Sequence, residues 1–112
     1  MPPSSTQAVS HWQVAALKGH VDAQCCLGVA YLWGWGVASD AARAVTWFRR
    51  AAEAGHAESQ YNLSICFKRG RGLKADSFQA ALWLRGAAAA GHHSAQLDEV
   101  VAGSAEISAR SR

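Results

Sequence analysis

Histidine and cysteine are the residues of this 112-residue chain whose chemistry could support catalysis or metal binding, and it contains five of the first and three of the second. Imidazole and thiolate groups bind zinc and act as acids, bases and nucleophiles. His20, His56 and His92, however, each follow a glycine and recur every 36 residues. Zinc requires three or four converging ligands, whereas side chains spaced by a constant repeat lie apart along the molecule. We therefore predict turn or helix-capping roles for these histidines, and no metal or cofactor.

Catalytic residues cannot be nominated from order or spacing, because catalytic triads are recognised by their geometry. His92 and His93, together with a nearby acid, form the alternative candidate for a metal site. The regular recurrence of the other histidines favours packing over chemistry. We therefore predict that the chain is not an enzyme.

The cysteines indicate a reducing compartment. Cys25 and Cys26 are neighbours that could bridge each other only through a strained ring, and Cys66 makes the count odd. The chain does not open on a basic segment followed by an apolar one, and no stretch reaches the about 18 apolar residues of a membrane span. We expect a cytoplasmic protein without a membrane segment. Cys66 is expected on the core face and Cys25 in a more exposed position.

A 36-residue internal repeat organises the chain. Residues 16–51 and 52–87 share twelve identical positions, among them Leu27 with Leu63. Within each unit the apolar residues fall at helical spacing, and paired glycines interrupt them where a tight turn between helices is required. Stacked helix pairs bury one continuous core, which a lone pair cannot do. The repeat therefore predicts an all-α solenoid of antiparallel helix pairs.

About six helices are predicted, with residues that can cap the second helix of each pair at Ser39 or Asp40 and at Asp76. The expected helices cover residues 6–18, 21–33, 40–54, 57–69, 76–90 and 93–103. They form a single domain, residues 1–103, made of a half repeat, two complete units and a C-terminal capping half repeat at 5–18, 19–54, 55–90 and 91–103. Glu99 takes the position of Leu27 in the capping part, which suits an uncovered face. Residues 104–112 are expected to be a disordered tail.

The sequence from Ala16 to Asp40 has the pattern A-x-x-G-x-x-x-A-Q-x-x-L-G-x-x-Y-x-x-G-x-G-V-x-x-D. This pattern resembles the Sel-one-like repeat, a relative of the tetratricopeptide repeat. The resemblance covers about residues 8–97 and departs in the second unit at Ser64, Phe67 and Leu73, which keep their positions small or apolar. It implies a right-handed superhelix and a role as adaptor or scaffold.

Some cysteine-rich members of that family bind or hydrolyse β-lactams and carry regularly spaced disulfides. The three cysteines of this chain do not repeat in that way. A β-lactam or cell-wall hydrolase is therefore the less favoured alternative.

Positions that vary between units while the core stays constant are candidates for partner binding. In tetratricopeptide-like arrays the first helix of each pair lines the concave surface with the face turned away from its own second helix. By position in the repeat, this face holds Cys25, Val29, Leu32 and Trp33, then Tyr61, Ile65, Lys68 and Arg69, then Leu97 and Val101. An apolar groove with a basic border suits an amphipathic helix or an extended segment with acidic flanks. The alternative is that the N-terminal segment or a second copy of the chain covers the groove.

The turn between the helices of a pair is the second candidate. Trp33 and Trp35 of the first unit are replaced by Arg69 and Arg71 in the second. Tryptophan and arginine dominate many interfaces, where each often contributes about 2 kcal/mol or more. We therefore predict that both pairs contact a partner. The alternative for Trp33 is that it packs on the neighbouring helix, whereas Trp35, between two turn glycines, is harder to bury internally.

Nucleic acid is not an expected partner. The net charge is only +3, and the basic cluster contains four residues, Lys68, Arg69, Arg71 and Lys74. Nucleic-acid binding requires a longer basic stripe with stacking aromatics. The sequence therefore favours a bacterial protein-interaction module that acts as an adaptor, regulator, chaperone or toxin-neutralising immunity protein. The alternative to capture of one partner is a homo-oligomeric scaffold.

Overall fold

The computed structural model describes residues 5–98, and the regular secondary structure in this range is helical throughout. The five complete helices are α1 (Ser5–Leu17), α2 (Val21–Trp33), α3 (Ala41–Glu53), α4 (Ala57–Arg69) and α5 (Ser77–Ala89). Residues 93–98 are helical as well and begin a sixth helix. The predicted all-α fold is confirmed. Glu99, Val101 and the expected tail lie outside the described residues.

The predicted capping residues explain where the helices begin and end. The Asp40 carboxylate accepts a hydrogen bond from the backbone N–H of Arg43, and Asp76 accepts two, from Phe78 and Gln79. Gly34 ends α2 at φ 71°, a left-handed conformation that favours glycine. Gly70 ends α4 in the same way at φ 69°.

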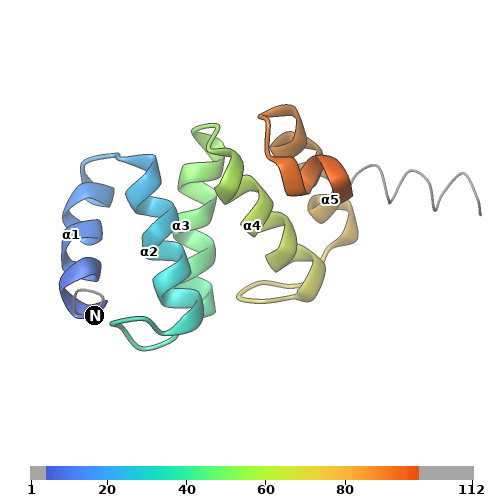
Figure 1. The fold of residues 1–112 in the computed structure, drawn as a ribbon. Helices are drawn as coiled ribbons and strands as arrows, with labels where there is room; N and C mark the ends of the chain where they lie inside the picture. The colour runs from blue at the N-terminus through green and yellow to red at the C-terminus, as the bar shows by residue number, and fades with distance from the viewer. Residues whose placement is uncertain (1–4, 99–112) are drawn as a thin grey trace, which may run out of the picture.

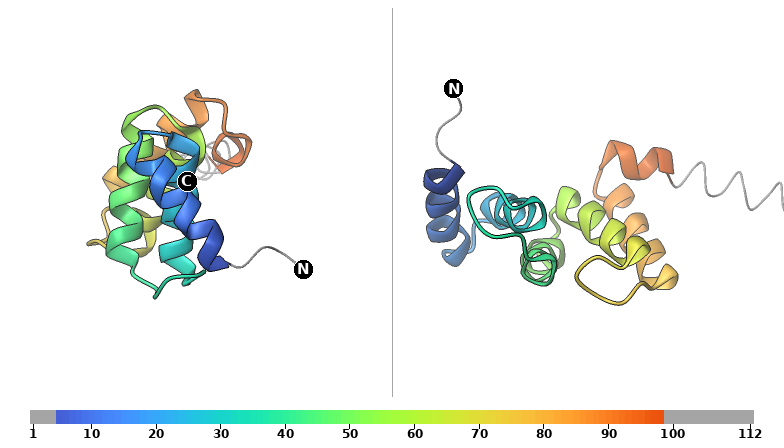
Figure 2. Two further views of the ribbon diagram at one scale, coloured as in Figure 1. Left: turned by 90° about the vertical axis from the view of Figure 1, so that its left-hand side faces the viewer. Right: turned by 90° about the horizontal axis from the view of Figure 1, so that it is seen from below.

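The helices stack side by side into an elongated body of 54 × 28 × 24 Å (Figure 1). Each helix packs on its neighbours in the chain, so that α2 lies between α1 and α3, and α4 lies between α3 and α5. Seen from below in Figure 2, α1 lies at one end of the stack and the helical residues 93–98 lie at the other. This one-dimensional arrangement is that of a solenoid.

The core runs along the stack as one row of buried side chains. Leu27, Phe48 and Leu63 are fully buried, and they come from α2, α3 and α4. Each contributes roughly 1.5–3 kcal/mol through the removal of apolar surface from water. Gly28 allows α2 to lie close to α3, because a Cβ atom there would stand 2.5 Å from Cε1 of Phe48.

Recurring glutamines fasten each first helix to the helix that precedes it. The side-chain amide of Gln60 donates to the carbonyl of Ala52 over 3.1 Å. Equivalent bonds join Gln24 to Ala16 and Gln96 to Ala88. These carbonyls lie in the last turn of their helices, where each also accepts the backbone N–H of a glycine, Gly19, Gly55 or Gly91.

Histidines join neighbouring units, in agreement with the structural role predicted from their recurrence. Nδ1 of His56 accepts from the backbone N–H of Ser59, so Nε2 carries the proton of the neutral ring and donates to Asp22 over 2.8 Å. His92 repeats the arrangement with Ala95 and Glu58, and its Nε2 lies 2.6 Å from the carboxylate. Both acids stand 34 residues before their histidine.

Candidate partner-binding groove

Two exposed tryptophans mark the turn between α2 and α3. Trp33 is the last residue of α2, and Trp35 lies between Gly34 and Gly36, which both have positive φ. The backbone N–H of Trp35 is held by the carbonyl of Ala30 over 2.9 Å. The backbone is therefore fixed while the two indole rings remain 57% and 54% exposed. Exposed rings on an ordered backbone lose little entropy when a partner covers them.

Arginine from the second unit lies over the first of these rings. The guanidinium carbon of Arg71 is 4.9 Å from the ring centroid of Trp33, which is a cation–π contact. Arg71 lies between Gly70 and Gly72, which both have positive φ. Trp35 lies between Gly34 and Gly36 in the same way. Trp33 thus contacts Arg71, which replaces Trp35 in the second unit, and not its own replacement Arg69.

A groove lies beside this contact, between α2 and α4. It has a volume of about 170 Å³ and contains six of the ten residues predicted to bind a partner. These six are Val29, Leu32, Trp33, Ile65, Arg69 and Arg71. The lining is mainly apolar and includes two basic residues, Arg69 and Arg71, and one neutral polar residue, Asn62.

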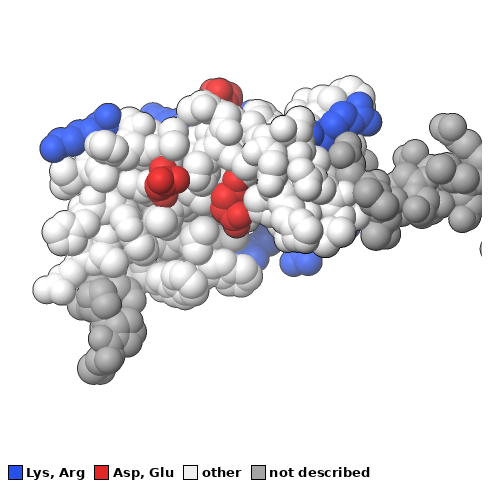
Figure 3. Space-filling view, turned by 45° about the horizontal axis from the view of Figure 1, so that its top comes forward, with Lys and Arg blue, Asp and Glu red and all other residues white. Residues whose placement is uncertain are grey.

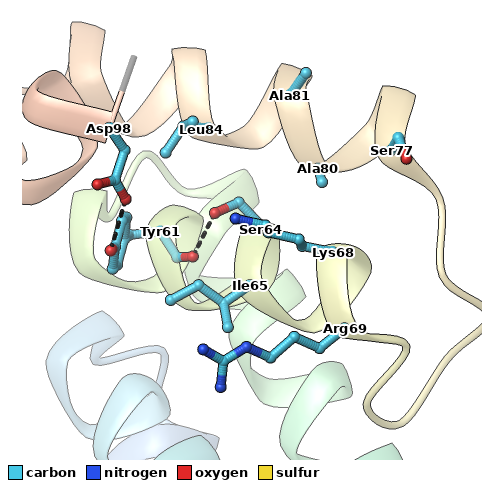
Figure 4. A pocket seen from close by; sticks show the side chains of 10 residues that line it. All are labelled: Tyr61, Ser64, Ile65, Lys68, Arg69, Ser77, Ala80, Ala81, Leu84 and Asp98. Atoms are coloured by element: carbon cyan, nitrogen blue, oxygen red, sulfur yellow. Dashed lines mark hydrogen bonds between the residues drawn. The ribbon is translucent and has the colours of Figure 1, made fainter. Parts of the chain in front are cut away.

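A larger groove of about 590 Å³ continues from the first (Figure 4). One wall is α4, with Tyr61, Ile65, Lys68 and Arg69, and the other is α5, with Ala80, Ala81 and Leu84. Ile65 and Arg69 belong to both grooves, so the two form one surface along α4. Trp35 lines neither groove, but it stands two residues after Trp33 in the same turn. We call the combined surface, together with Trp35, the α4 groove.

Tyr61 serves the structure of the protein as well as its surface. Its ring stacks on that of His92, with 4.4 Å between the centroids, and its hydroxyl donates to Asp98 over 2.9 Å (Figure 4). The hydrogen bond to Asp98 raises the pKa of Tyr61 above its ordinary value of 10.0. Tyr61 therefore anchors the helical residues 93–98 at one end of the α4 groove. This contact could not be predicted from the sequence, because it joins residues 37 positions apart.

Cys25 is buried, and the expectation of an exposed position was wrong. Its exposed fraction is 6%, and its sulfur accepts a hydrogen bond from Nδ2 of Asn62 at 3.8 Å. The reason is that the face of α2 that holds Cys25 packs against α4 of the next unit. Cys66 is buried as predicted, whereas Cys26 is half-buried.

The thiols are poor nucleophiles at neutral pH. Burial raises the thiol pKa above its ordinary value of 9.0 in all three residues, Cys25, Cys26 and Cys66. Within residues 5–98, no three His, Cys, Asp or Glu side chains come together as metal ligands.

The charged side chains on the face shown in Figure 3 do not gather into one patch. The face in Figure 3 is largely uncharged, with separate acidic groups near its middle and basic groups toward its edges. A continuous basic stripe that could follow a nucleic-acid backbone is absent from that face. The basic residues of the α4 groove are Lys68, Arg69 and Arg71.

A model of the Sel1 repeat matches this sequence three times, at residues 1–20, 21–56 and 57–92. The chain belongs to the Sel1 repeat family. The second and third matches begin 36 residues apart, which is the spacing of the repeat in the sequence. Sel1 repeat proteins are generally protein-interaction modules, and their fold is typically a non-enzymatic scaffold.

Solved structures of Sel1 repeat proteins have the same fold. A protective antigen of uropathogenic Escherichia coli strains, described as displaying an SLR fold, is 42% identical over 77% of this chain, with a TM-score of 0.76. A Sel1 repeat protein of Oxalobacter formigenes is 33% identical over 82% of the chain, with a TM-score of 0.78. Cysteine rich protein B of Helicobacter pylori is 20% identical over 78%, with a TM-score of 0.75.

The chain spans 18% and 38% of the length of the first two Sel1 proteins and 65% of the third. The likeness therefore concerns the repeats. A search of curated proteins found no significant match. None of the described helices has the length and apolar character needed to cross a membrane.

Proposed function

We propose that this Sel1 repeat chain captures one protein partner in the α4 groove, with Trp33, Trp35, Arg69 and Arg71 as the main contacts. In this role it is an adaptor, regulator, chaperone or immunity-type protein and not an enzyme. The observation that carries the proposal is the contact of Arg71 with the ring of Trp33 at the mouth of the groove. It brings the two residue types that dominate interface energies together on an exposed surface.

The partner segment is an amphipathic helix or an extended peptide that carries acidic residues beside apolar ones. Its apolar side chains would lie on Val29, Leu32 and Ile65, and its carboxylates would meet Arg69 and Arg71. Arginine suits this task because its planar group binds carboxylates through two parallel hydrogen bonds. Cys25 supports this surface without being exposed on it, because its side chain is buried.

The cytoplasm of a bacterium is the compartment that we propose for this activity. All three cysteines are free, which agrees with a reducing environment. The three similar solved structures come from bacteria, Escherichia coli, Oxalobacter formigenes and Helicobacter pylori.

Capture from extract of the native host tests the proposal. The immobilised chain is compared with its Trp35→Ala and Arg69→Glu variants, and bound proteins are quantified by mass spectrometry. Phe78→Ala and Lys18→Glu are the matched controls, because Phe78 is 70% exposed on α5 and Lys18 is exposed beyond α1. We expect one protein to be enriched by the wild type and both controls and lost from both groove variants, while all variants keep their helical circular dichroism. Retention of that protein by both groove variants would disprove the proposed site.

A further inference from the structure

The end of the solenoid that carries α1 has a second open surface, remote in the stack from the groove walls of α5. Figure 2 (left) looks onto this end, where α1 lies in front of the other described helices. A pocket of about 480 Å³ lies between α1 and the start of α2. It is lined by Trp12, Ala15, His20, Val21, Asp22, Ala23 and Cys26. We call it the α1 pocket.

The same positions one unit later are covered by a helix. The residue equivalent to Trp12 is Phe48, which is fully buried under Gly28 of α2. The residue equivalent to Cys26 is Asn62, which donates to the sulfur of Cys25. In the interior of the stack, α2 therefore fills the place that is open at the α1 pocket.

His20 is the histidine of the α1 pocket, and it lacks the partner that its equivalents have. His56 and His92 each donate to an acid 34 residues earlier, in the first turn of the preceding first helix. His20 is exposed and makes no side-chain cap, and no hydrogen bond of its ring is found among the described residues. A carboxylate that accepted a hydrogen bond from His20, as Asp22 does from His56, would complete the arrangement.

We propose that the α1 pocket receives an amphipathic helix of a partner protein, which adds one more helix to the solenoid. The interior of the stack defines the sequence of this helix. It carries Asp or Glu in its first turn, like Asp22 and Glu58, and a side chain that packs three residues later, like Cys25 and Tyr61. Six residues after the acid it has a small residue, like Gly28 and Ser64.

The small residue is required by Trp12. A Cβ atom on Gly28 would already stand 2.5 Å from the ring of Phe48, and the indole of Trp12 is larger than that ring. A large side chain at this point of the partner helix would hold it away from α1, where the acid could not reach His20. His20 therefore requires an acid in the partner helix, and Trp12 requires a small residue six positions after that acid.

A second copy of the chain does not meet these requirements. The equivalent positions of its last repeat are Ser94 in place of the acid and Val100 in place of the small residue. Its two matching helices, α2 and α4, already use Asp22 and Glu58 on their own histidines. A separate partner is therefore the occupant that fits the charge and the shape of the pocket.

The first test uses a peptide with the sequence of residues 21–40, in which Cys25 and Cys26 are replaced by tyrosine and asparagine, the residues at the equivalent positions 61 and 62. Peptide is titrated into the isotope-labelled chain, and the side-chain NMR signals of Trp12 and His20 are followed. We expect saturable shifts of both, and about fivefold weaker binding when the peptide residue equivalent to Asp22 is asparagine. A peptide with leucine at the position of Gly28 should bind at least tenfold more weakly. The His20→Ala chain should bind the aspartate and asparagine peptides equally.

The second test covalently supplies the same helix, so that weak folding of a free peptide cannot hide an effect. Residues 21–40 are duplicated and joined directly to Ser5, which places the added aspartate 34 residues before His20. We expect a higher unfolding midpoint than that of the parent chain, and a smaller rise when the added aspartate is asparagine. No shift at Trp12 and His20 together with no rise in the midpoint would overturn the proposal. Light scattering that shows a dimer lost in His20→Ala would assign the pocket to a second copy and would overturn it also.

Discussion

Two helix-interior glycines should respond in opposite directions to the same substitution. Gly28 in α2 faces Phe48, where a new Cβ would stand 2.5 and 2.7 Å from two ring carbons. Gly86 in α5 has only Gln60 near it, with Oε1 3.6 Å from the position of the Cβ. Both are helical and neither has a positive φ. We predict that Gly28→Ala destabilises the protein and that Gly86→Ala stabilises it.

The magnitude follows from separating helix propensity from packing. Alanine is favoured over glycine in a helix by about 0.5–1 kcal/mol, and this gain applies equally to both sites. Carbon atoms in contact prefer about 3.5–4.0 Å, so the Cβ of residue 28 must displace Phe48, which is fully buried. Overpacking of this kind costs about 1–3 kcal/mol. The difference in the free energy of unfolding between the two variants therefore reports the packing cost alone, about 1–3 kcal/mol.

Urea unfolding followed by circular dichroism at 222 nm measures this difference. Addition of Phe48→Leu to Gly28→Ala should recover part of the lost stability, because the second unit has Ser64 and Leu84 at the equivalent positions. Equal stabilisation by the two alanines, or no recovery by leucine, would refute the close approach of α2 and α3.

Three further predictions concern contacts between units. His56→Ala should lower the free energy of unfolding by about 1 kcal/mol through loss of a helix cap, whereas His20→Ala should stay within about 0.5 kcal/mol because its ring caps nothing. A double-mutant cycle between Trp33 and Arg71 in urea should give a coupling of about 0.5 kcal/mol, as befits an exposed cation–π pair. Folding raises the pKa of the Cys25 and Cys66 thiols, so the unfolded chain loses these protons at a lower pH than the folded chain does. The free energy of unfolding should therefore fall as the pH rises above about 9. Replacement of both cysteines by alanine should flatten this fall, which urea titrations at a series of pH values measure.

The helices could be predicted from the sequence because their signals are local. Asp40 and Asp76 stand at the caps, and glycines end the helices at Gly34 and Gly70, as the pattern indicated. These features depend on residues within one turn of each other, and the repeat shows each of them twice.

Contacts between units could not be predicted from the sequence. Gln24, Gln60 and Gln96 recur visibly, but only the stacked helices show that each reaches a carbonyl eight residues earlier. The same limit explains the error at Cys25, whose burial depends on how closely α4 lies on α2.

The α4 groove could be predicted in part. Side chains that differ between units on one helix face indicated Val29, Ile65 and Arg69, and the structure brings them into one groove. The contact between Trp33 and Arg71 was not predictable, because it depends on the offset between successive turns. The wall formed by α5 was also missed, since its alanines carry no signal that distinguishes a groove from a core.

Photo-crosslinking in the native host tests partner capture at the α4 groove most directly. Trp35 is replaced by photoreactive benzoylphenylalanine, and Phe78, which is exposed on α5 outside the groove, is replaced in a matched control. The account predicts that irradiation links one protein to position 35 and not to position 78, and that Arg69→Glu removes the product. Absence of a product at position 35, or equal products at both positions, would contradict the claim that this surface holds a protein partner.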